Sequence, residues 1–231
     1  MKHVLVTGGS DGLGKVSAKK LKEAGFKVTI LSRDEQRTKA VAEEIGCEYV
    51  VADVSDHEMV GKALARATKV SGQVDVLINN AGIWIQGPIE DDDPKKIKRT
   101  LEVNTLGPIY CTQAVIPNMK KRRSGRIINV ISQGGLYAKS ERGSYGTSKW
   151  GLTGFTRSMQ AELKPFNISV VGLFPSALKS PMKHSIFSKA GNARDMSKGL
   201  DPAVVADAIV YICKLPDGIN VTEFGIESLE Y

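Results

Sequence analysis

Cysteine is scarce in this sequence of 231 residues. The three cysteines, Cys47, Cys111 and Cys213, are odd in number and far apart, and no Cys-x-x-Cys pair or Cys/His cluster occurs. This pattern argues against a disulfide framework and against a zinc site. We therefore predict no metal cofactor and a reducing, cytoplasmic environment.

Long apolar runs are missing as well. The longest, Ile168 to Phe174, has the length of a strand and falls far short of the roughly 20 residues that span a bilayer. Near the N-terminus, Gly8 and Gly9 closely follow the short apolar run Val4 to Val6, which leaves no room for the apolar core of a secretory signal. We expect no membrane association.

An excess of basic residues gives the chain a formal net charge of +7, from 32 basic and 25 acidic residues. The basic residues cluster at positions 19–22, 95–99 and 120–123, in separate helix-like segments without any base-reading motif. We interpret these clusters as solvated helix faces and predict no nucleic-acid partner. A modest positive field does favour a phosphorylated cofactor.

Strand-like and helix-like segments alternate along the whole chain. The strand candidates are mostly unbroken runs of Val, Ile and Leu, which are typical of strands buried on both faces. They span residues 3–6, 27–31, 49–52, 74–78, 126–131, 168–174 and 219–226. This alternation predicts parallel βαβ units, and hence an α/β fold with a doubly wound parallel sheet of about seven strands and helices on both faces.

The length suits a single domain, and 42% hydrophobic with 25% charged residues is the balance of a globular protein. We therefore predict one domain over residues 1–231. The one long irregular stretch is residues 176–200. Loops of that length in compact domains are often active-site lids, so we expect a substrate lid there. In doubly wound sheets ligands bind beyond the carboxyl ends of the strands, so the residues just after strands matter most.

A glycine-rich turn follows the first strand candidate and opens a helix. Glycines let the chain turn tightly and let phosphates approach the backbone N–H groups at a helix N-terminus. Glycines alone are generic turn formers, but their position after the first strand indicates a nucleotide site. The residues expected to contact the cofactor here are Thr7, Gly8, Ser10, Asp11, Gly12, Leu13 and Gly14.

The second strand candidate ends in residues that bear on the adenosine ribose of a nucleotide. Ser32 stands where a carboxylate would bind the ribose hydroxyls and repel a 2′-phosphate, and the Arg33 guanidinium that follows suits a phosphate. This favours NADP(H) over NAD(H). Asp34 lies at about the sequence separation from the glycine-rich turn that is expected of a ribose-binding acid, but we place it in the cap of the next helix. Asp53, with Val54 beside it, is a candidate to bind the adenine amino group; its alternative role is a turn or helix cap.

Further polar residues follow the fourth and fifth strand candidates. Asn79-Asn80-Ala81-Gly82 follows the fourth, Asn104 lies within the next long helix, and Ser132 ends the fifth. Tyr145 and Lys149 are four residues apart, on one face of a helix. A Tyr-x-x-x-Lys pair alone is a weak sign, since a helix-surface pair reads the same. Its place thirteen residues after a strand-end serine, behind a nucleotide loop, gives it weight.

In combination these motifs resemble those of the short-chain dehydrogenase/reductase family, from Met1 to about Met182 and more loosely to the end. The motifs concerned are Thr7-Gly8-x-x-x-Gly12-x-Gly14, Asn79-Asn80-Ala81-Gly82 and the set Asn104, Ser132, Tyr145 and Lys149. The resemblance implies a Rossmann-type sheet, a nicotinamide cofactor and a homodimer or homotetramer. It also implies that Asn80, Ala81 and Gly82 border the cofactor, that Lys149 binds the nicotinamide ribose, and that Asn104 holds a water in a proton relay.

These residues suit the interconversion of a carbonyl and an alcohol on a small molecule. NADPH would supply the hydride, and Ser132 would hold the substrate oxygen. Tyr145 is the expected proton donor; a tyrosine ordinarily titrates near about 10, and we expect the Lys149 ammonium one turn away to lower that pKa. Tyr110 and Tyr137 are alternative acids by type, but neither has a lysine four residues on.

Two other classes of function fit parts of the sequence. A non-catalytic NADP(H)-binding sensor or scaffold can share the fold, but it has no need of Ser132, Tyr145 and Lys149 together. A basic nucleic-acid binder would bind DNA with a strong salt dependence. We therefore predict an NADP-dependent oxidoreductase.

The sequence departs from the family pattern after the sixth strand. Where Pro-Gly and then a threonine are usual, it has Pro175-Ser176 and then Ser180, all three of which we expect at the cofactor. Ser180 keeps the hydroxyl that binds the carboxamide in the family. Ser176 puts a side chain where glycine lets the nicotinamide approach, with a consequence that the sequence leaves open. The lid carries Lys179, Lys183, Lys189, Arg194 and Lys198 against Asp195, which suits either an acidic substrate or a solvated loop.

Overall fold

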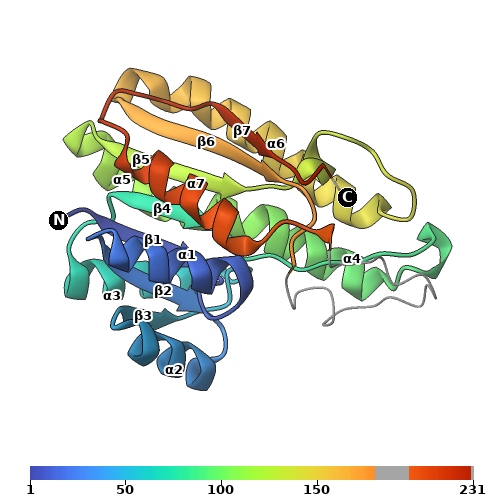
Figure 1. Cartoon of the computed structure of the whole chain (residues 1–231), viewed down its shortest axis with the longest axis horizontal. Helices are drawn as coiled ribbons and strands as arrows, with labels where there is room; N and C mark the ends of the chain where they lie inside the picture. The colour runs from blue at the N-terminus through green and yellow to red at the C-terminus, as the bar shows by residue number, and fades with distance from the viewer. Residues whose placement is uncertain (180–197, 230–231) are drawn as a thin grey trace.

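The structure is a computed structural model that describes residues 1–179 and 198–229. Its seven strands form one sheet in the order β3-β2-β1-β4-β5-β6-β7 (Figure 1). The strands are β1 His3–Thr7, β2 Lys27–Ser32, β3 Glu48–Val51, β4 Val76–Asn79, β5 Gly125–Val130, β6 Ile168–Pro175 and β7 Glu223–Ile226. Every neighbouring pair in this sheet is parallel. The predicted α/β fold with a doubly wound parallel sheet is confirmed.

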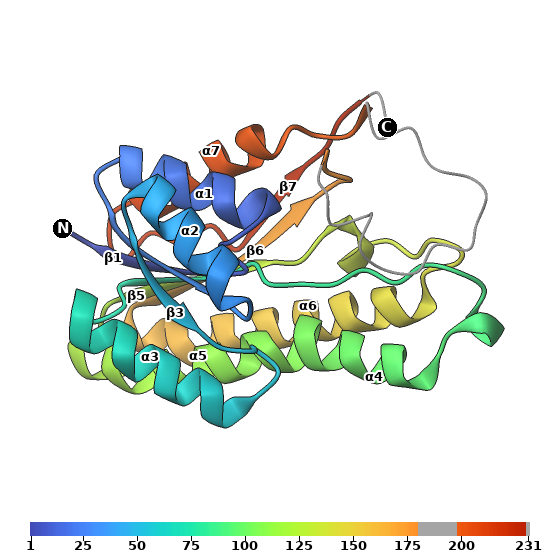
Figure 2. The same cartoon turned by 90° about the horizontal axis from the view of Figure 1, so that it is seen from below.

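Helices cover both faces of the sheet, as predicted. They are α1 Gly12–Glu23, α2 Glu35–Ile45, α3 His57–Ser71, α4 Pro94–Leu101, α5 Gly107–Arg122, α6 Gly143–Leu163 and α7 Pro202–Lys214. Figure 2 shows α1, α2 and α7 on one side of the sheet and α3, α4, α5 and α6 on the other. Within the described ranges, no helix is both long enough and apolar enough to cross a membrane.

The first strand shows why these segments read as unbroken apolar runs. Val4 and Val6 belong to the core on one face of the sheet, whereas Leu5 belongs to the core on the other face. All three side chains are fully buried. Since helices cover both faces, successive residues of a central strand are apolar whichever way they point.

Aspartate side chains cap the first turns of most helices. The capping residues are Asp11 for α1, Asp34 for α2, Asp56 for α3, Asp93 for α4 and Asp201 for α7, and each accepts a hydrogen bond from a backbone N–H. Pro94 and Pro202 open α4 and α7, where a proline loses only an N–H that the first turn leaves unpaired. Asp34 thus takes the cap position predicted for it.

The long helix predicted to contain Asn104 is not regular throughout. A π-helical turn, Glu102–Leu106, joins α4 to α5, and the Gly107 N–H donates to the Glu102 carbonyl across it. Pro108 supplies the reason. It has no N–H to donate to the carbonyl of Asn104, four residues back, so a regular α-helix cannot pass through this point. Asn104 therefore lies in a π-turn within the predicted long helix.

The amino edge of the sheet carries a buried arginine. Arg126, at the start of β5, is only 5% exposed, and its Nε lies 3.3 Å from the Ser169 hydroxyl. The guanidinium also donates at 2.5–3.2 Å to the carbonyls of Ile212, Leu215, Pro216 and Ile219. The last strand begins at Glu223 and is shorter than the predicted 219–226. Arg126 thus ties the segment after α7 to the sheet.

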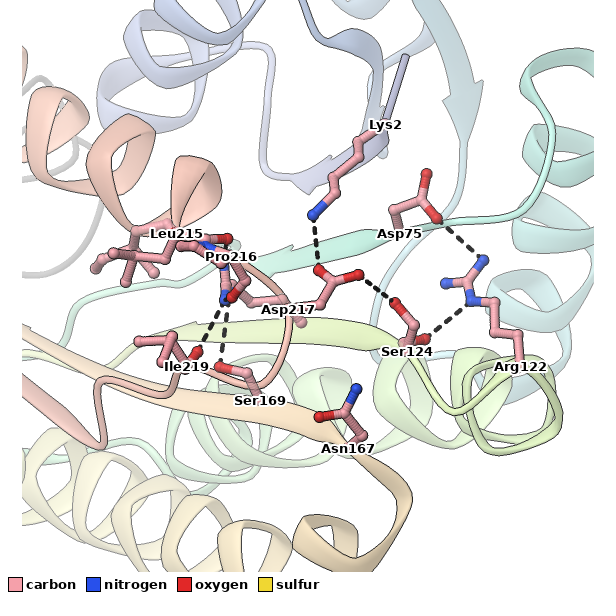
Figure 3. Close-up of polar contacts among 12 residues, drawn as sticks. Lys2, Asp75, Arg122, Ser124, Asn167, Ser169, Leu215, Pro216, Asp217 and Ile219 are labelled. Carbon is pink, nitrogen blue, oxygen red and sulfur yellow. Dashed lines mark hydrogen bonds and ion pairs between the residues drawn. The ribbon is translucent and has the colours of Figure 1, made fainter.

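Charged side chains continue this network along the same edge (Figure 3). The Asp217 carboxylate accepts hydrogen bonds from Lys2 at 2.8 Å and from the Ser124 hydroxyl at 3.1 Å. Arg122 pairs with Asp75 at 3.1 Å and donates to the Ser124 carbonyl at 2.9 Å. The amino edge is therefore closed by mutual pairing of its polar groups.

Candidate active site

A cavity of about 450 Å³ lies at the carboxyl ends of the strands, where β2 and β4 flank β1 and the strand order changes direction. Such switch points are the usual ligand sites of doubly wound sheets. The predicted site residues that line the cavity are Gly8, Ser10, Asp11, Gly12, Leu13, Ser32, Arg33, Asp53, Val54, Asn80, Ala81, Gly82, Ser132, Tyr145, Lys149, Pro175 and Ser176. Thr7, Gly14 and Asn104 are not in this lining, and Ser180 lies outside the described residues.

The glycine-rich turn is shaped by close backbone contacts. Gly8 and Gly12 adopt φ values of +65° and +49°, the left-handed region that favours glycine. A side chain at Gly14 would meet the Gly8 carbonyl oxygen at 2.2 Å. These glycines therefore let the N-terminus of α1 open directly on the cavity, where its unpaired N–H groups suit an anion.

Thr7 acts from outside the cavity, as a clamp between β1 and the turn after β4. Its hydroxyl donates to the Ile78 carbonyl at 3.3 Å and accepts from the Asn80 and Ala81 N–H groups, both at 3.0 Å. The Asn80 side chain returns the contact by donating to the carbonyls of Thr7, at 2.9 Å, and Gly8, at 3.3 Å. The two turns predicted to bind the cofactor are thus joined to one another.

The outer end of the cavity carries charged side chains. Arg33 is exposed, and no hydrogen bond or ion pair holds its guanidinium among the described residues. Arg37, in the first turn of α2, pairs with Asp11 at 2.7 Å. The Ser32 hydroxyl accepts a hydrogen bond from the Ser10 N–H at 3.3 Å, which ties the end of β2 to the glycine-rich turn.

Asp53 is more firmly held than the sequence indicated. Its carboxylate accepts from the Ser55 N–H at 3.0 Å, from the Ser55 hydroxyl at 2.7 Å and from Arg99 of α4 at 2.5 Å. Burial acts to raise the pKa of Asp53, but these hydrogen bonds outweigh it and the pKa is lowered. The carboxylate therefore stays ionised and fixed at the cavity wall. Both of its proposed roles, in the turn and toward an adenine, remain compatible with this position.

The inner end of the cavity contains Tyr145 and Lys149, both nearly fully buried on α6. Burial raises the pKa of Tyr145, and this outweighs a hydrogen bond with Ser132 and the charge of Arg142, which both lower it. Burial lowers the pKa of Lys149 to about 8. The Lys149 Nζ donates to the Val130 carbonyl at 3.2 Å.

The expected fall in the Tyr145 pKa is therefore wrong for this structure. The Lys149 Nζ lies 5.8 Å from the centre of the Tyr145 ring, and the loss of hydration around the phenol is the larger effect. A phenol in such a site holds its proton at neutral pH. This suits a group that gives up a proton only to a strongly basic oxygen.

Ser132 has a strained backbone. Its φ is +123°, a value that residues with a side chain rarely adopt, and its hydroxyl accepts a hydrogen bond from the Gly134 N–H at 3.1 Å. A side chain at Gly134 would come within 3.2 Å of the Tyr145 ring. Strain of this kind collects at functional sites, where the surroundings impose the conformation. Here the strained backbone places the Ser132 hydroxyl on the side of the Tyr145 phenol, just after the carboxyl end of β5.

Asn104 lies next to the inner end and is fully buried. Its side-chain oxygen accepts from the Ile83 N–H at 2.8 Å, and its nitrogen donates to the Ile83 carbonyl at 2.9 Å and to the Ser148 hydroxyl at 3.0 Å. The π-turn therefore connects the segment after β4 to α6, beside Tyr145 and Lys149. In this arrangement Asn104 positions other residues, and its water-holding role stays a prediction from resemblance.

Ser176 forms hydrogen bonds at the end of β6. It is 9% exposed, its N–H donates to the Ile226 carbonyl at 2.8 Å, and its hydroxyl accepts from the Ser228 N–H at 3.3 Å. The hydroxyl thus ties the end of β6 to the segment after β7. The serine takes a structural bond at this edge of the cavity while still lining it.

The alternative acids lie elsewhere. Tyr137 is 61% exposed, and Tyr110 packs edge-on against His57 with ring centres 5.2 Å apart. Neither belongs to the cavity lining, unlike Tyr145.

Several lining residues escaped the sequence reasoning. Trp84 stacks at a tilt against Tyr145, with ring centres 4.3 Å apart, and Arg142 lies over the Trp84 ring at 4.7 Å. Arg37 and Arg99 line the outer end. The only signal for Trp84 was its place shortly after Gly82. For Arg37 it was the first turn of the helix after β2. Arg99 had none, since α4 reaches the cavity through tertiary packing.

The described ends of the expected lid, 176–200, meet beside the cavity. Lys179 donates its N–H to the Leu200 carbonyl, and Leu200 donates to the Ala177 carbonyl, both at 2.8 Å. Ala177 and Leu178 line the cavity. Ser180 and residues 181–197, with Lys183, Lys189, Arg194 and Asp195, lie outside the described residues, so the lid and its charge stay predictions.

Comparison with known proteins places these features in a family. The sequence profile of the family described as short chain dehydrogenase matches residues 2–191. The chain is 32% identical over 222 residues to a trans-4-hydroxycyclohexanecarboxylate dehydrogenase of Sinomonas cyclohexanicum, a match that covers 91% of this chain and 85% of that protein.

Solved structures share the whole fold. A 3-ketoacyl-(acyl-carrier-protein) reductase from Brucella melitensis, complexed with NADH, is 30% identical with a TM-score of 0.90, over 99% of this chain and 98% of that one. An alcohol dehydrogenase from the archaeon Thermococcus sibiricus, complexed with 5-hydroxy-NADP, is 26% identical with a TM-score of 0.90, over 100% and 98%. These similar structures thus hold both kinds of nicotinamide nucleotide.

Proposed function

The chain belongs to the short chain dehydrogenase family, and from the contents of its cavity we propose an NADP-dependent oxidoreductase that interconverts a carbonyl and an alcohol by hydride transfer. The observation that carries this proposal is a single cavity with two chemically different ends. The Ser132 and Tyr145 hydroxyls lie at its inner end, and Arg33, which has no hydrogen-bond or ion-pair partner among the described residues, lies at its outer end.

The residues present fit a dinucleotide phosphate. The N-terminus of α1 opens on the middle of the cavity through glycines with positive φ, which suits a pyrophosphate. Gly82 lines the wall between the two ends, and a side chain there would meet Asn104 Oδ1 at 3.3 Å and Lys149 Nζ at 3.8 Å. When bound, NADPH would supply the hydride that the protein itself lacks.

The chain's own residues supply orientation and a proton. Ser132 would donate a hydrogen bond to the substrate carbonyl oxygen, and its strained backbone holds the hydroxyl in place. Tyr145, whose pKa is raised by burial, keeps its proton until that oxygen becomes strongly basic during reduction. Lys149, with a pKa of about 8, changes charge near neutral pH and so influences how readily the phenol releases its proton.

Arg33 supports the preference for NADP(H). A guanidinium that is exposed, unpaired and on the cavity wall is free to bind a phosphate. No carboxylate occupies the preceding position, where Ser32 bonds to Ser10. A ribose-binding acid in that position would have repelled the phosphate.

The substrate is a small carbonyl or hydroxy compound. Ile83, Trp84 and Leu178 give the inner end apolar walls, which suits a hydrocarbon or ring skeleton beside the reacting carbonyl. The relative from Sinomonas cyclohexanicum is named for a cyclic hydroxy acid, so we place cyclic hydroxy acids and their ketones among the candidates.

The test is the oxidation of NADPH against a panel of ketones, aldehydes, diketones, quinones and cyclic oxo acids, with NADH in parallel. The panel is repeated with NADPH carrying deuterium at C4, in separate samples for each face of the ring. We expect turnover with NADPH above that with NADH, and deuterium at the carbinol carbon of the product. Tight NADPH binding without turnover on any class would favour the sensor or scaffold instead.

Assembly as a homodimer or homotetramer, and a cytoplasmic location, remain proposals that rest on the family resemblance and on the sparse cysteines. Sedimentation velocity of the purified chain tests the first. A single species at the mass of one chain would contradict it.

A further inference from the structure

The outer end of the cavity holds charges of both signs. Asp11, Arg33, Asp34 and Arg37 all line it. The two carboxylates are engaged differently. Asp34 accepts a hydrogen bond from the backbone N–H of Arg37 at 3.0 Å, whereas Asp11 forms an ion pair with the Arg37 guanidinium at 2.7 Å. Asp11 therefore pairs with the guanidinium of Arg37. Without that ion pair, Arg37 would be available to bind an anionic ligand, as Arg33 is.

Asp11 also caps helix α1, and this structural role does not require its negative charge. One carboxylate oxygen accepts a hydrogen bond from the Gly12 N–H at 2.8 Å and so caps α1, while the other oxygen pairs with Arg37. An asparagine caps a helix about as well as an aspartate does. Replacing Asp11 by asparagine therefore keeps the cap and removes the charge that holds Arg37.

We propose that Asp11 is a specificity-determining residue that limits the preference for NADP(H) by competing with the 2′-phosphate for Arg37. This inference rests on the proposed use of NADP(H). A phosphate that pairs with Arg37 must displace the Asp11 carboxylate or share the guanidinium with it, and in both cases two like charges come close. A ribose without the phosphate does not compete for Arg37, so removing the Asp11 charge should favour NADPH more than NADH, although both carry the pyrophosphate that faces α1.

The exposure of the pair sets the size of the effect. The side chains of Arg37 and Asp11 are 53% and 43% exposed, so water screens their interaction. Exposed ion pairs of this kind change affinity by up to about fivefold. We therefore expect Asp11→Asn to raise the preference for NADPH over NADH, measured as the ratio of the two Kd values, by up to about fivefold.

The experiment is isothermal titration calorimetry of NADPH and NADH with the wild type, Asp11→Asn, Arg37→Gln and the double variant. Arg37→Gln should weaken NADPH binding. In that background Asp11→Asn should not change the preference for NADPH any further, because Asp11 has no guanidinium left to pair with. Thermal unfolding of each variant confirms that α1 and the fold are intact.

Asp34→Asn is the matched control. It removes the same charge from the same end of the cavity and keeps a cap for α2, but no ion pair with Arg37 is lost. A gain in NADPH affinity equal to that of Asp11→Asn would overturn the proposal in favour of a general field effect. An Asp11→Asn effect on the ratio of the two Kd values that is absent, or that persists without Arg37, would overturn it as well.

Failure of the underlying assignment gives a different result. If the wild type binds NADPH no more tightly than NADH and Arg33→Ala weakens both alike, the proposed preference for NADP(H) is refuted. If the wild type prefers NADPH and Arg33→Ala abolishes that preference, but Asp11→Asn changes nothing, only the role of Asp11 is refuted.

Discussion

Arg126 lies at the amino ends of the strands and donates hydrogen bonds to several carbonyls. Lys149 lies at the carboxyl ends and, among the described residues, donates to one carbonyl. Arg126 donates to four carbonyls and approaches the Ser169 hydroxyl. Lys149 is equally buried, but among the described residues only the Val130 carbonyl accepts from it. The same sheet therefore buries one cation with hydrogen-bond partners for all its side-chain nitrogens and another with a single partner, although burial lowers the pKa of both.

The difference separates structural from chemical use of charge. A buried charge whose donors are all satisfied holds elements together and has nothing left for a ligand. A buried charge with few partners costs stability and shifts its pKa, as the value of about 8 for Lys149 illustrates. We infer that the loss of stability from burying Lys149 is tolerated because Lys149 and Tyr145 act on a bound substrate and cofactor.

The largest effect that we expect is a loss of turnover in Tyr145→Phe, a substitution at the carboxyl end of the sheet that removes the phenol hydroxyl and leaves the buried ring. Turnover should fall by about 1000-fold, because a positioned proton donor contributes on the order of 10²–10⁴. The Kd for NADPH should change little. Initial rates of NADPH oxidation and calorimetric titration measure the two quantities.

Tyr137→Phe is the control, since Tyr137 is exposed and outside the cavity lining. It should keep wild-type turnover. Wild-type turnover in Tyr145→Phe, or a comparable loss in both variants, would remove Tyr145 from the reaction.

At the opposite end, Arg126→Met should lower the free energy of unfolding by about 3 kcal/mol, because several buried carbonyls lose their donor together. Turnover per folded molecule should stay at the wild-type value, as Arg126 lies at the other end of the strand from the cavity. Urea unfolding provides the free energy.

Arg157→Met is matched to it by the same substitution in an exposed ion pair. Arg157 bonds Glu223 at 2.8 Å with both side chains partly exposed, so its loss should cost less than about 1 kcal/mol. Equal losses in the two variants would show that the amino-edge network is no more than another surface contact.

The smallest of these effects concerns the outer end of the cavity. Arg33→Ala should raise the Kd for NADPH by about tenfold through the loss of one charge-assisted phosphate contact, and it should leave the Kd for NADH nearly unchanged. Calorimetric titration with both nucleotides measures this. Equal weakening of the two would exclude Arg33 from phosphate recognition.

The sheet could be predicted because its signals are local. Mostly unbroken apolar runs marked the strands, and Asp34 took the helix-cap position assigned to it. Candidate site residues that directly follow strands came together at the cavity for the same reason, since parallel strands end at one edge.

What escaped prediction depends on tertiary packing. The π-turn at Glu102–Leu106 was not predicted from the sequence. Arg99 reaches the cavity from α4, far along the chain from β3 and Asp53. The sign of the Tyr145 pKa shift was missed because helix spacing shows Lys149 one turn away but does not show how deeply both side chains are buried.

The measurement that tests the central claim most directly is the free energy of unfolding of the wild type and Lys149→Met across pH. The folded-state pKa of Lys149, about 8, lies below the ordinary 10.5, so between these values the unfolded chain binds more protons. The stability contributed by Lys149 must therefore rise with pH through that window, by about 3 kcal/mol in total. We predict that Lys149→Met is the more stable protein at pH 7 and that its advantage shrinks as the pH rises above about 8. A difference between the two proteins that does not change with pH would contradict an uncompensated charge at the carboxyl end of the sheet.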